Sequence, residues 1–275
     1  MRPIRTISVF PTLLTLGNLI CGFFAIVVAA RVGKPVVETW QEQMIGDAGA
    51  VMLSGGLIFL AMIFDGLDGY VARLARTTSD FGAQLDSLCD VVSFGVAPGF
   101  LLVKICPKFT LWHNQTVWII AAAFAACAAL RLARFNVETT DDDEHLYFSG
   151  LPSPAAAAVI AGFAIMFHAL RNEAGLAASW RSAIDNGLQS VLPLFAVLIA
   201  LLMVSRIRYP HVTNRVLRGH RSFGHVVAVV FFLVAIMAFF GYAMAIAASA
   251  FALYGPIRLA WQLWVQHRRR DEPLF

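Results

Sequence analysis

Charged residues are scarce in this sequence, because Asp, Glu, Lys and Arg together make up only 14% of its 275 residues. Soluble domains usually carry about 25% of these residues. Apolar residues reach 59% of the chain, and the mean hydropathy is +0.72. One soluble core cannot bury so much apolar surface. The composition therefore excludes a soluble globular protein and indicates a protein whose solvent is the lipid bilayer.

Cysteine and histidine are also sparse, and neither is spaced for metal binding or redox chemistry. The four cysteines lie in or beside apolar stretches without a CxxC pair, and the seven histidines show no paired spacing near other candidate ligands. We interpret the cysteines as small core residues and expect no catalytic histidine. The net charge of +4 comes from arginines in short loops, where they set topology and meet anionic head groups, so nucleic acid is not an expected partner.

Eight apolar stretches are long enough to cross a bilayer, which takes about 20 mostly apolar residues per helix. They are residues 12–31, 50–72, 86–106, 115–134, 152–170, 188–205, 225–241 and 243–263. As one helix, the last two would overshoot the bilayer, so we expect a break near Gly241 and Tyr242. The predicted fold is an all-α integral membrane bundle of about eight transmembrane helices, forming a single polytopic domain over residues 1–275.

Lysine and arginine fall unevenly on the two sides of these spans. If the N-terminus is cytoplasmic, fifteen of these residues lie on the cytoplasmic side and six on the other. Because positive residues concentrate in cytoplasmic loops, both termini are predicted to be cytoplasmic. The expected location is the inner or plasma membrane, with the bilayer lipids as surroundings.

Four aspartates occur near the cytoplasmic ends of the second and third spans. Asp65 and Asp68 are three residues apart, whereas Gly82, Asp86 and Asp90 follow one another at intervals of four. Each set therefore occupies one face of its helix. A short loop between the two spans lets these faces meet, so the four carboxylates are predicted to converge.

Four carboxylates at membrane depth need a positive charge between them, since each costs about 2.5–3.5 kcal/mol to insert. A hard divalent cation supplies that charge. Oxygen ligands without histidine or thiolate favour Mg²⁺ or Mn²⁺ over zinc, such sites commonly share a substrate phosphate, and four carboxylates are enough for two ions. The alternative is a structural role, in which the aspartates pair with nearby arginines, namely Arg73, Arg76, Arg131 and Arg134.

Several other residues near the aspartates have two open interpretations. Gly69 and Gly82 let a ligand approach the backbone, but glycine also serves helix packing in membranes. Arg73 either clamps a phosphate or anchors a helix end at the interface. Asn18, in the first span, either contacts a nucleotide or bonds another helix.

The spacing D-x2-DG-x2-AR-x8-G-x3-D-x3-D, from Asp65 to Asp90, resembles the signature of the CDP-alcohol phosphatidyltransferase family at every position. Three further stretches look like its serine-using branch, the integral membrane type of phosphatidylserine synthase. They are P-x3-T-x2-N-x3-G from Pro11, LRLARFN from Leu130 and FSGLPSP from Phe148. The resemblance implies a catalytic core over about residues 10–205 and a C-terminal helix pair over about 225–263.

The resemblance also implies an activity and a role for each motif residue. The phosphatidyl group would pass from CDP-diacylglycerol to the hydroxyl of L-serine by direct displacement, with CMP as leaving group. Two Mg²⁺ or Mn²⁺ ions would be the cofactor, and a homodimer would be the assembly. Asp65, Asp68 and Asp86 would hold metal, while Asp90 would both touch metal and take the proton from serine. The CDP-lipid would bind around Asn18, Gly69, Ala72, Arg73 and Gly82.

The acceptor pocket is predicted from charge placement. Arg131 and Arg134, three residues apart at a cytoplasmic helix end, suit the carboxylate of serine, although arginines there also serve as topology anchors. Pro152 and Ser153 belong to a turn that starts the fifth helix and also lines the predicted pocket. The acidic residues 141–144 and the arginines at 268–270 receive no role.

Two alternative functions stay open. Another member of the family would use glycerol phosphate or inositol phosphate as acceptor, or an archaeal ether lipid as donor; a phosphorylated acceptor needs a stronger cationic pocket. A divalent-cation or lipid transporter would also place carboxylates in a membrane bundle. The lack of inverted repeats and the position of the aspartates toward one side of the membrane argue against transport.

Overall fold

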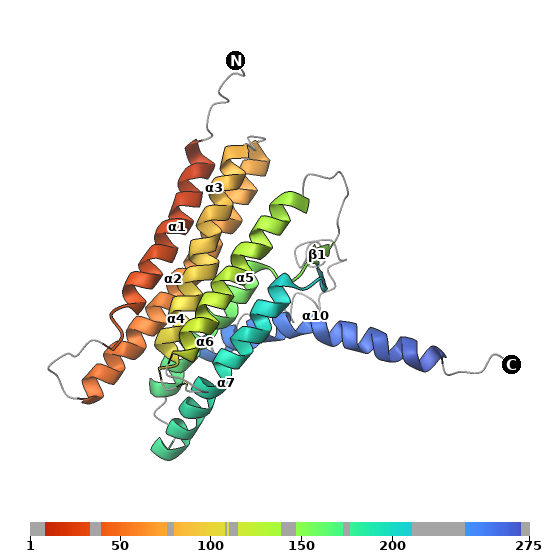
Figure 1. Cartoon of the computed structure of the whole chain (residues 1–275). Helices are drawn as coiled ribbons and strands as arrows, with labels where there is room; N and C mark the ends of the chain where they lie inside the picture. The colour runs from red at the N-terminus through yellow and green to blue at the C-terminus, as the bar shows by residue number, and fades with distance from the viewer. Residues whose placement is uncertain are drawn as a thin grey trace, which may run out of the picture.

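The protein folds into long helices that pack side by side (Figure 1). A computed structural model describes residues 9–33, 40–75, 80–107, 109, 115–138, 147–172, 177–210 and 240–270. The helices are α1 (Val9–Ala29), α2 (Trp40–Ala75), α3 (Asp80–Asp90), the π-helix η1 (Val91–Val96), α4 (Ala97–Ile105), α5 (Thr116–Glu138), α6 (Ser153–Asn172), α7 (Ala178–Val204) and α10 (Phe240–Arg270). Two short strands, β1 (Tyr147–Ser149) and β2 (Arg208–Pro210), pair antiparallel.

Within the described ranges, seven helical segments are long and apolar enough to cross a membrane. They are Pro11–Ala29, Gly46–Val71, Phe81–Ile105, Thr116–Val137, Ser153–Asn172, Ala178–Val204 and Gly241–Gln266. These segments confirm a helical, multi-pass membrane protein. The predicted span 225–241 lies almost entirely outside the described residues, so the count of eight and the cytoplasmic placement of the termini stay predictions.

Several helices extend well beyond the apolar stretches that predicted them. Helix α2 starts at Trp40 instead of residue 50, and α7 starts at Ala178 instead of residue 188. Hydropathy marks only the part of a helix that suits hydrocarbon. The additional turns contain polar residues that continue the helix, so α2 and α7 are longer than the predicted spans.

The third span contains a π-helical turn that the sequence prediction did not include. Helix α3, the π-helix and α4 follow one another without a break from Asp80 to Ile105. The Ala97 N–H bonds to the Val92 carbonyl, five residues back, and Pro98 next to it has no N–H to offer the preceding turn. Single π-helical turns occur frequently at functional sites. This one begins directly after Asp90.

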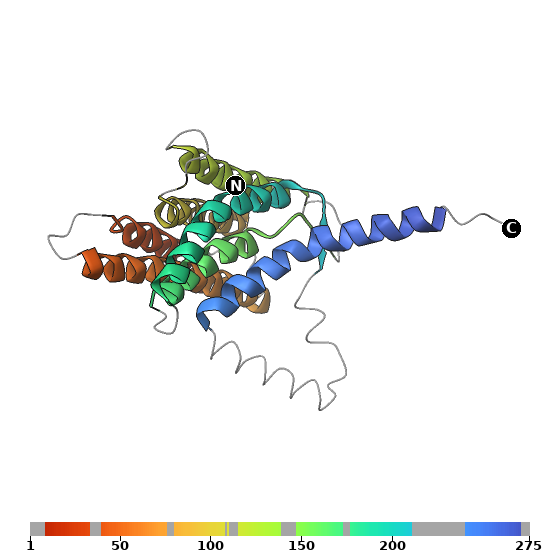
Figure 2. The ribbon, with the colours of Figure 1, turned by 90° about the horizontal axis from the view of Figure 1, so that it is seen from below.

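Helix α6 is the central element of the bundle. It contacts α2, α4, α7 and α10, and Figure 2 shows it in green among them. Small residues allow this close packing, because a Cβ at Gly55 of α2 would lie 2.8 Å from the Ala161 carbonyl oxygen, and one at Gly162 would lie 2.8 Å from the Ala245 nitrogen. The core therefore depends on backbone approach between helices.

Helix α10 leaves the bundle sideways, as both views show (Figures 1 and 2), and Tyr209 of β2 attaches it. The buried Tyr209 hydroxyl donates a hydrogen bond of 2.8 Å to the Ala252 carbonyl. That carbonyl has no helical partner because Pro256, four residues later, lacks an N–H. Gly255 makes room for the ring, since a Cβ there would lie 2.7 Å from its Cε1 atom. Burial raises the pKa of Tyr209 to about 12, which keeps the hydroxyl protonated as a donor.

One end of the bundle gathers the predicted functional elements. The start of α1, the end of α2, the start of α3 and the end of α5 lie toward the upper end in Figure 1. We call this the site end. The opposite end, where α6 ends and α7 begins, is the far end.

Candidate functional site

Three carboxylates converge between α2 and α3. One oxygen each from Asp65, Asp68 and Asp86 lies within 4.8 Å of the others. Asp65 and Asp68 come from the last turns of α2, and Asp86 comes from α3, which runs in the opposite direction (Figure 1). We call these three residues the acidic cluster. The structure thus brings together three of the four aspartates that the sequence predicted to meet.

The acidic cluster has the properties of a cation site. Asp68 is only 5% exposed, and the Oδ2 atom of Asp68 and the Oδ1 atom of Asp86 are buried without a hydrogen-bond partner among the described residues. An unsatisfied buried oxygen is costly, and three carboxylates at this separation repel one another. A donor set made only of carboxylate oxygens suits a hard divalent cation such as Mg²⁺ or Mn²⁺. The residues present therefore fit the metal that the sequence predicted.

Asp90 lies beside the acidic cluster but has a different environment. It is 7% exposed, and its Oδ1 atom accepts a hydrogen bond of 3.0 Å from Nδ2 of Asn18. Its position one turn after Asp86 keeps it close enough to interact electrostatically with all three cluster carboxylates. Asp90 thus borders the predicted cation site while one of its oxygens is held by α1.

Asn18 therefore takes the second of its two sequence interpretations, a bond to another helix. Its side chain is fully buried in α1 and faces Asp90 of the third span. The sequence offered no signal for this partner, because 72 residues separate the two positions. A contact between Asn18 and a nucleotide stays a prediction.

Arg131 joins the predicted acceptor pocket to the aspartates. Its Nη1 atom donates a hydrogen bond of 2.7 Å to Oγ of Ser153, and its guanidinium carbon lies 5.9 Å from the centre of the Phe135 ring. Its charge interacts with both Asp65 and Asp90. The end of α5 and the start of α6 thus present a cation, held by two side chains, at the border of the acidic cluster.

The turn before Ser153 is fixed by backbone contacts. Gly150 has a positive φ of +82°, a conformation that favours glycine, and its N–H donates to the Ile207 carbonyl at 2.9 Å. The Leu151 N–H donates to the Leu202 carbonyl at 3.0 Å. The Pro152 carbonyl accepts from Ala156 at 3.0 Å, which starts α6 as predicted. The loop between β1 and α6 therefore rests on the end of α7.

Ser87 and Asn136 form a contact that the sequence reasoning missed. Nδ2 of Asn136 donates to Oγ of Ser87 at 2.9 Å, and the Ser87 hydroxyl also reaches the Ala83 carbonyl at 3.0 Å. This contact ties α5 to α3 at the residue next to Asp86. Asn136 is the last residue of the LRLARFN stretch. Its place in that stretch was the only feature of the sequence that marked Asn136 as a candidate functional residue.

The remaining predicted residues lie at the same end of the bundle. Gly69 of α2, Gly82 of α3 and Arg134 of α5 are each half-buried. Ala72 and Arg73 lie in α2, but their side chains are outside the described part of the structure, as are residues 76–79 and 141–146. Binding of a CDP-lipid by these residues stays a prediction.

Comparison with known proteins places the chain in a family. A family profile for CDP-alcohol phosphatidyltransferases matches residues 8–203, which is most of the chain. The protein therefore belongs to the CDP-alcohol phosphatidyltransferase family, as its sequence motif predicted.

Individual relatives share one name. The chain is 40% identical over 168 residues to the CDP-diacylglycerol–serine O-phosphatidyltransferase of Methanocaldococcus jannaschii, covering 61% of this chain and 69% of that protein. It is 33% identical over 211 residues to the enzyme of the same name from Helicobacter pylori, covering 76% and 75%. It is 37% identical over 136 residues to the enzyme of that name from Saccharomyces cerevisiae, covering 47% of each chain. These similarities reach bacterial, archaeal and eukaryotic proteins.

Proposed function

We propose that this protein is a transferase that moves the phosphatidyl group of CDP-diacylglycerol to the hydroxyl of L-serine and releases CMP. Family membership supports the reaction class, and the shared name of the relatives supports the two substrates. The observation that carries the proposal is the acidic cluster, with its two unsatisfied carboxylate oxygens next to Asp90 and Arg131.

The acidic cluster supplies the cation site in this proposal. Asp65, Asp68 and Asp86 would hold Mg²⁺ or Mn²⁺, with Asp90 beside them as a further ligand and two ions as the proposed number. When bound, such a cation neutralises charge on the diphosphate and activates the phosphorus toward attack. The backbone near Gly69 and Gly82, with Ala72 and Arg73, would hold the cytidine diphosphate at the same end of the bundle.

Asp90 acts as the general base. The hydroxyl of serine is a poor nucleophile at neutral pH and needs a proton acceptor within hydrogen-bond reach. Because Asn18 occupies Oδ1 of Asp90, Oδ2 is the atom available to receive the proton. The serine oxygen forms its bond to the lipid-side phosphorus, the bond from that phosphorus to the CMP oxygen breaks, and the proton passes to Asp90.

Arg131 binds the carboxylate of serine. A guanidinium matches a carboxylate in two parallel hydrogen bonds, and Ser153 and Phe135 hold this one in place. Because its charge interacts with that of Asp90, we assign the carboxylate of serine to Arg131 and the hydroxyl to Asp90. Arg134 and Pro152 complete the proposed pocket.

The proposal includes a location and an assembly. The site faces the cytoplasm from the inner or plasma membrane, so serine and CMP exchange with water while the lipid donor enters from the bilayer. The uneven distribution of arginine and lysine supports this orientation. A homodimer is proposed from the resemblance to the family.

Release of CMP by purified protein in detergent tests the proposed function. The protein is given CDP-diacylglycerol and Mg²⁺ or Mn²⁺, and L-serine is compared with glycerol 3-phosphate and inositol phosphate. We expect release that requires serine and stops when the metal is chelated. Release only with a phosphorylated acceptor would overturn serine as the acceptor, and no release with any acceptor would contradict the proposed function.

A further inference from the structure

A set of buried contacts joins the middle of α1 to the π-helical turn that follows Asp90. The Asn18 side chain donates to Oδ1 of Asp90 at 3.0 Å, and the Asn18 backbone carbonyl accepts from Oγ of Ser93 at 3.0 Å. All three residues are buried. One residue of α1 therefore bonds both to the residue before the π-helical turn and to a residue inside it.

Gly22 brings the two helices close enough for these bonds. It lies one turn after Asn18 on the same face of α1. A Cβ at this position would lie 2.7 Å from the Cα atom of Ser93, which is closer than such atoms come in proteins. Asn18 and Gly22 are the last two fixed residues of the P-x3-T-x2-N-x3-G stretch. Both therefore contribute to the contact between α1 and the turn after Asp90.

The π-helical turn begins directly after Asp90. The helix widens from Val91 onward, where the Ala97 N–H reaches back to the Val92 carbonyl. Asp90 keeps helical backbone angles, φ −62° and ψ −39°, and it is the last residue before the widened turn. The bonds from α1 hold the turn at Asp90 and again at Ser93.

We propose that Asn18 is a positioning residue that orients Asp90 for proton transfer, and that the contact of α1 with the π-helical turn at Ser93 and Gly22 maintains this orientation. The inference rests on the proposed role of Asp90 as general base. Asn18 fixes Oδ1 and thereby directs Oδ2 toward the acceptor hydroxyl. In this role it acts through Asp90.

Substitution of Asn18 separates positioning from nucleotide binding. Asn18→Leu keeps the approximate size but removes the donor, whereas Asn18→Asp keeps the size and places an acceptor against Oδ1 of Asp90. We expect kcat to fall by about 100-fold in both variants, within the range of general-base contributions. The KM for CDP-diacylglycerol, and the Kd for CMP measured on the protein without turnover, are expected to change by less than about twofold.

Ser54→Ala is the matched structural control. Ser54 is buried in α2 and donates a hydrogen bond of 2.8 Å to the Ala25 carbonyl of α1, away from Asp90. We expect this variant to lose some thermal stability and keep its kcat. Ser93→Ala, which leaves the bond between Asn18 and Asp90 in place, is expected to lower kcat by less than Asn18→Leu.

Three results would overturn the positioning role. They are an unchanged kcat in both Asn18 variants, a weakened Kd for CMP with unchanged kcat, and a loss of kcat in Ser54→Ala as large as in Asn18→Leu. Thermal unfolding in detergent shows whether each variant is folded. The kcat is measured with the hydroxyl acceptor that the wild type uses. If that acceptor is not serine, the proposed function fails in the CMP-release test, while the test of Asn18 still applies.

Discussion

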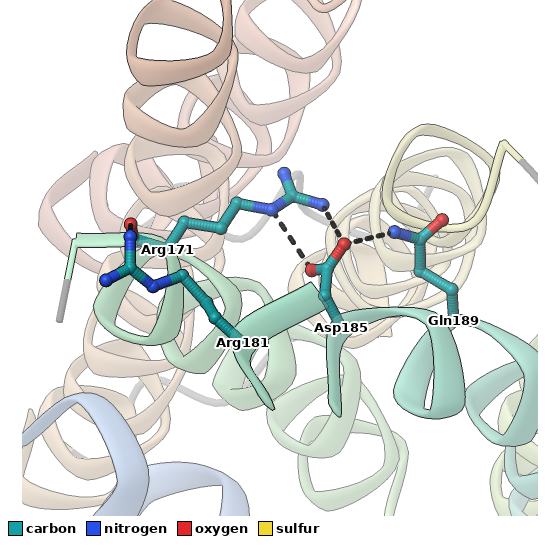
Figure 3. A network of polar contacts seen from close by, with 4 residues as sticks. All are labelled: Arg171, Arg181, Asp185 and Gln189. Carbon is teal, nitrogen blue, oxygen red and sulfur yellow. Dashed lines mark hydrogen bonds and ion pairs between the residues drawn. The ribbon is translucent and has the colours of Figure 1, made fainter. Parts of the chain in front are cut away.

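The two ends of the bundle treat their carboxylates in opposite ways. At the far end, Asp185 of α7 accepts two hydrogen bonds from Arg171 of α6, at 3.1 and 3.3 Å, and one from Gln189 at 2.7 Å (Figure 3). Arg171 also lies 5.4 Å from the centre of the Phe167 ring, and its carbonyl accepts from Arg181 at 3.4 Å. The chain itself neutralises Asp185.

At the site end, the chain leaves carboxylate oxygens unsatisfied. Asp68 and Asp86 each have a buried oxygen without a partner in the described part of the protein, and Asp65 lies against both residues. Aspartates in apolar helices therefore have different roles at the two ends of the bundle. Asp185 is satisfied by partners inside the fold, whereas carboxylates with buried oxygens that lack a partner call for a cation from outside.

The strongest test of this contrast is a substitution in the acidic cluster. Asp86→Asn is expected to lower CMP release by about 10⁴-fold, because the cation contributes several kcal/mol to transition-state stabilisation. Asp185→Asn is the control, since it removes a carboxylate of the far end. An Asp86→Asn variant with wild-type turnover would show that the cluster is structural.

Asp90→Asn is expected to lower CMP release by about 10³-fold while donor binding is retained, because an amide cannot accept the proton. Single-turnover CMP release and equilibrium binding of a CDP-lipid check the two parts of this prediction. Full activity would remove Asp90 from the role of base, and loss of donor binding would make it a binding residue instead.

Arg131→Met is expected to raise the KM for L-serine by about 10- to 100-fold, since a hydrogen bond between charged groups contributes about 1.5–3 kcal/mol. The KM for CDP-diacylglycerol should stay close to that of the wild type. Arg206→Met, which removes an exposed arginine, controls for the general loss of positive charge. Equal effects of the two substitutions on the serine KM would refute a specific carboxylate site.

The far end is expected to influence stability alone. Arg171→Met leaves Asp185 without its cation and should lower the free energy of unfolding by about 1–3 kcal/mol, less than for a fully buried pair because the two side chains are 22% and 15% exposed. The double variant Arg171→Met with Asp185→Leu should recover most of this loss. Thermal unfolding in detergent measures the loss in the single variant and the recovery in the double variant. An accompanying loss of kcat would contradict a purely structural role for the far end.

Tyr209→Phe has the smallest expected effect on activity. It leaves the Ala252 carbonyl, which Pro256 has deprived of its helical partner, without a donor. The cost is expected to be about 1–2 kcal/mol of stability, measured by thermal unfolding, with kcat unchanged. Unchanged stability would mean that another group replaces the Tyr209 hydroxyl.

The sequence was sufficient for the family and for the facing aspartates, because both depend on fixed local spacing. Asp65 and Asp68 share a helix face at any position in a membrane bundle. Hydropathy also located seven segments that the structure confirms as long apolar helices.

Packing between distant segments was beyond prediction. The partner of Asn18 lies 72 residues away, and the π-helical turn depends on local hydrogen bonding that no hydrophobic pattern marks. The predicted span 188–205 begins three residues after Asp185, which the structure places in α7. The sequence therefore marked the four aspartates of the site end and gave no sign of Asp185.

Binding of Mn²⁺ to purified protein, followed by electron paramagnetic resonance, tests the central claim most directly. The wild type and Asp185→Asn are expected to bind the ion with the same affinity, while Asp68→Asn is expected to bind it at least about 10-fold more weakly, because one ligand oxygen is lost. Equal binding by Asp68→Asn and the wild type, or lost binding in Asp185→Asn alone, would contradict the assignment of the acidic cluster as the cation site.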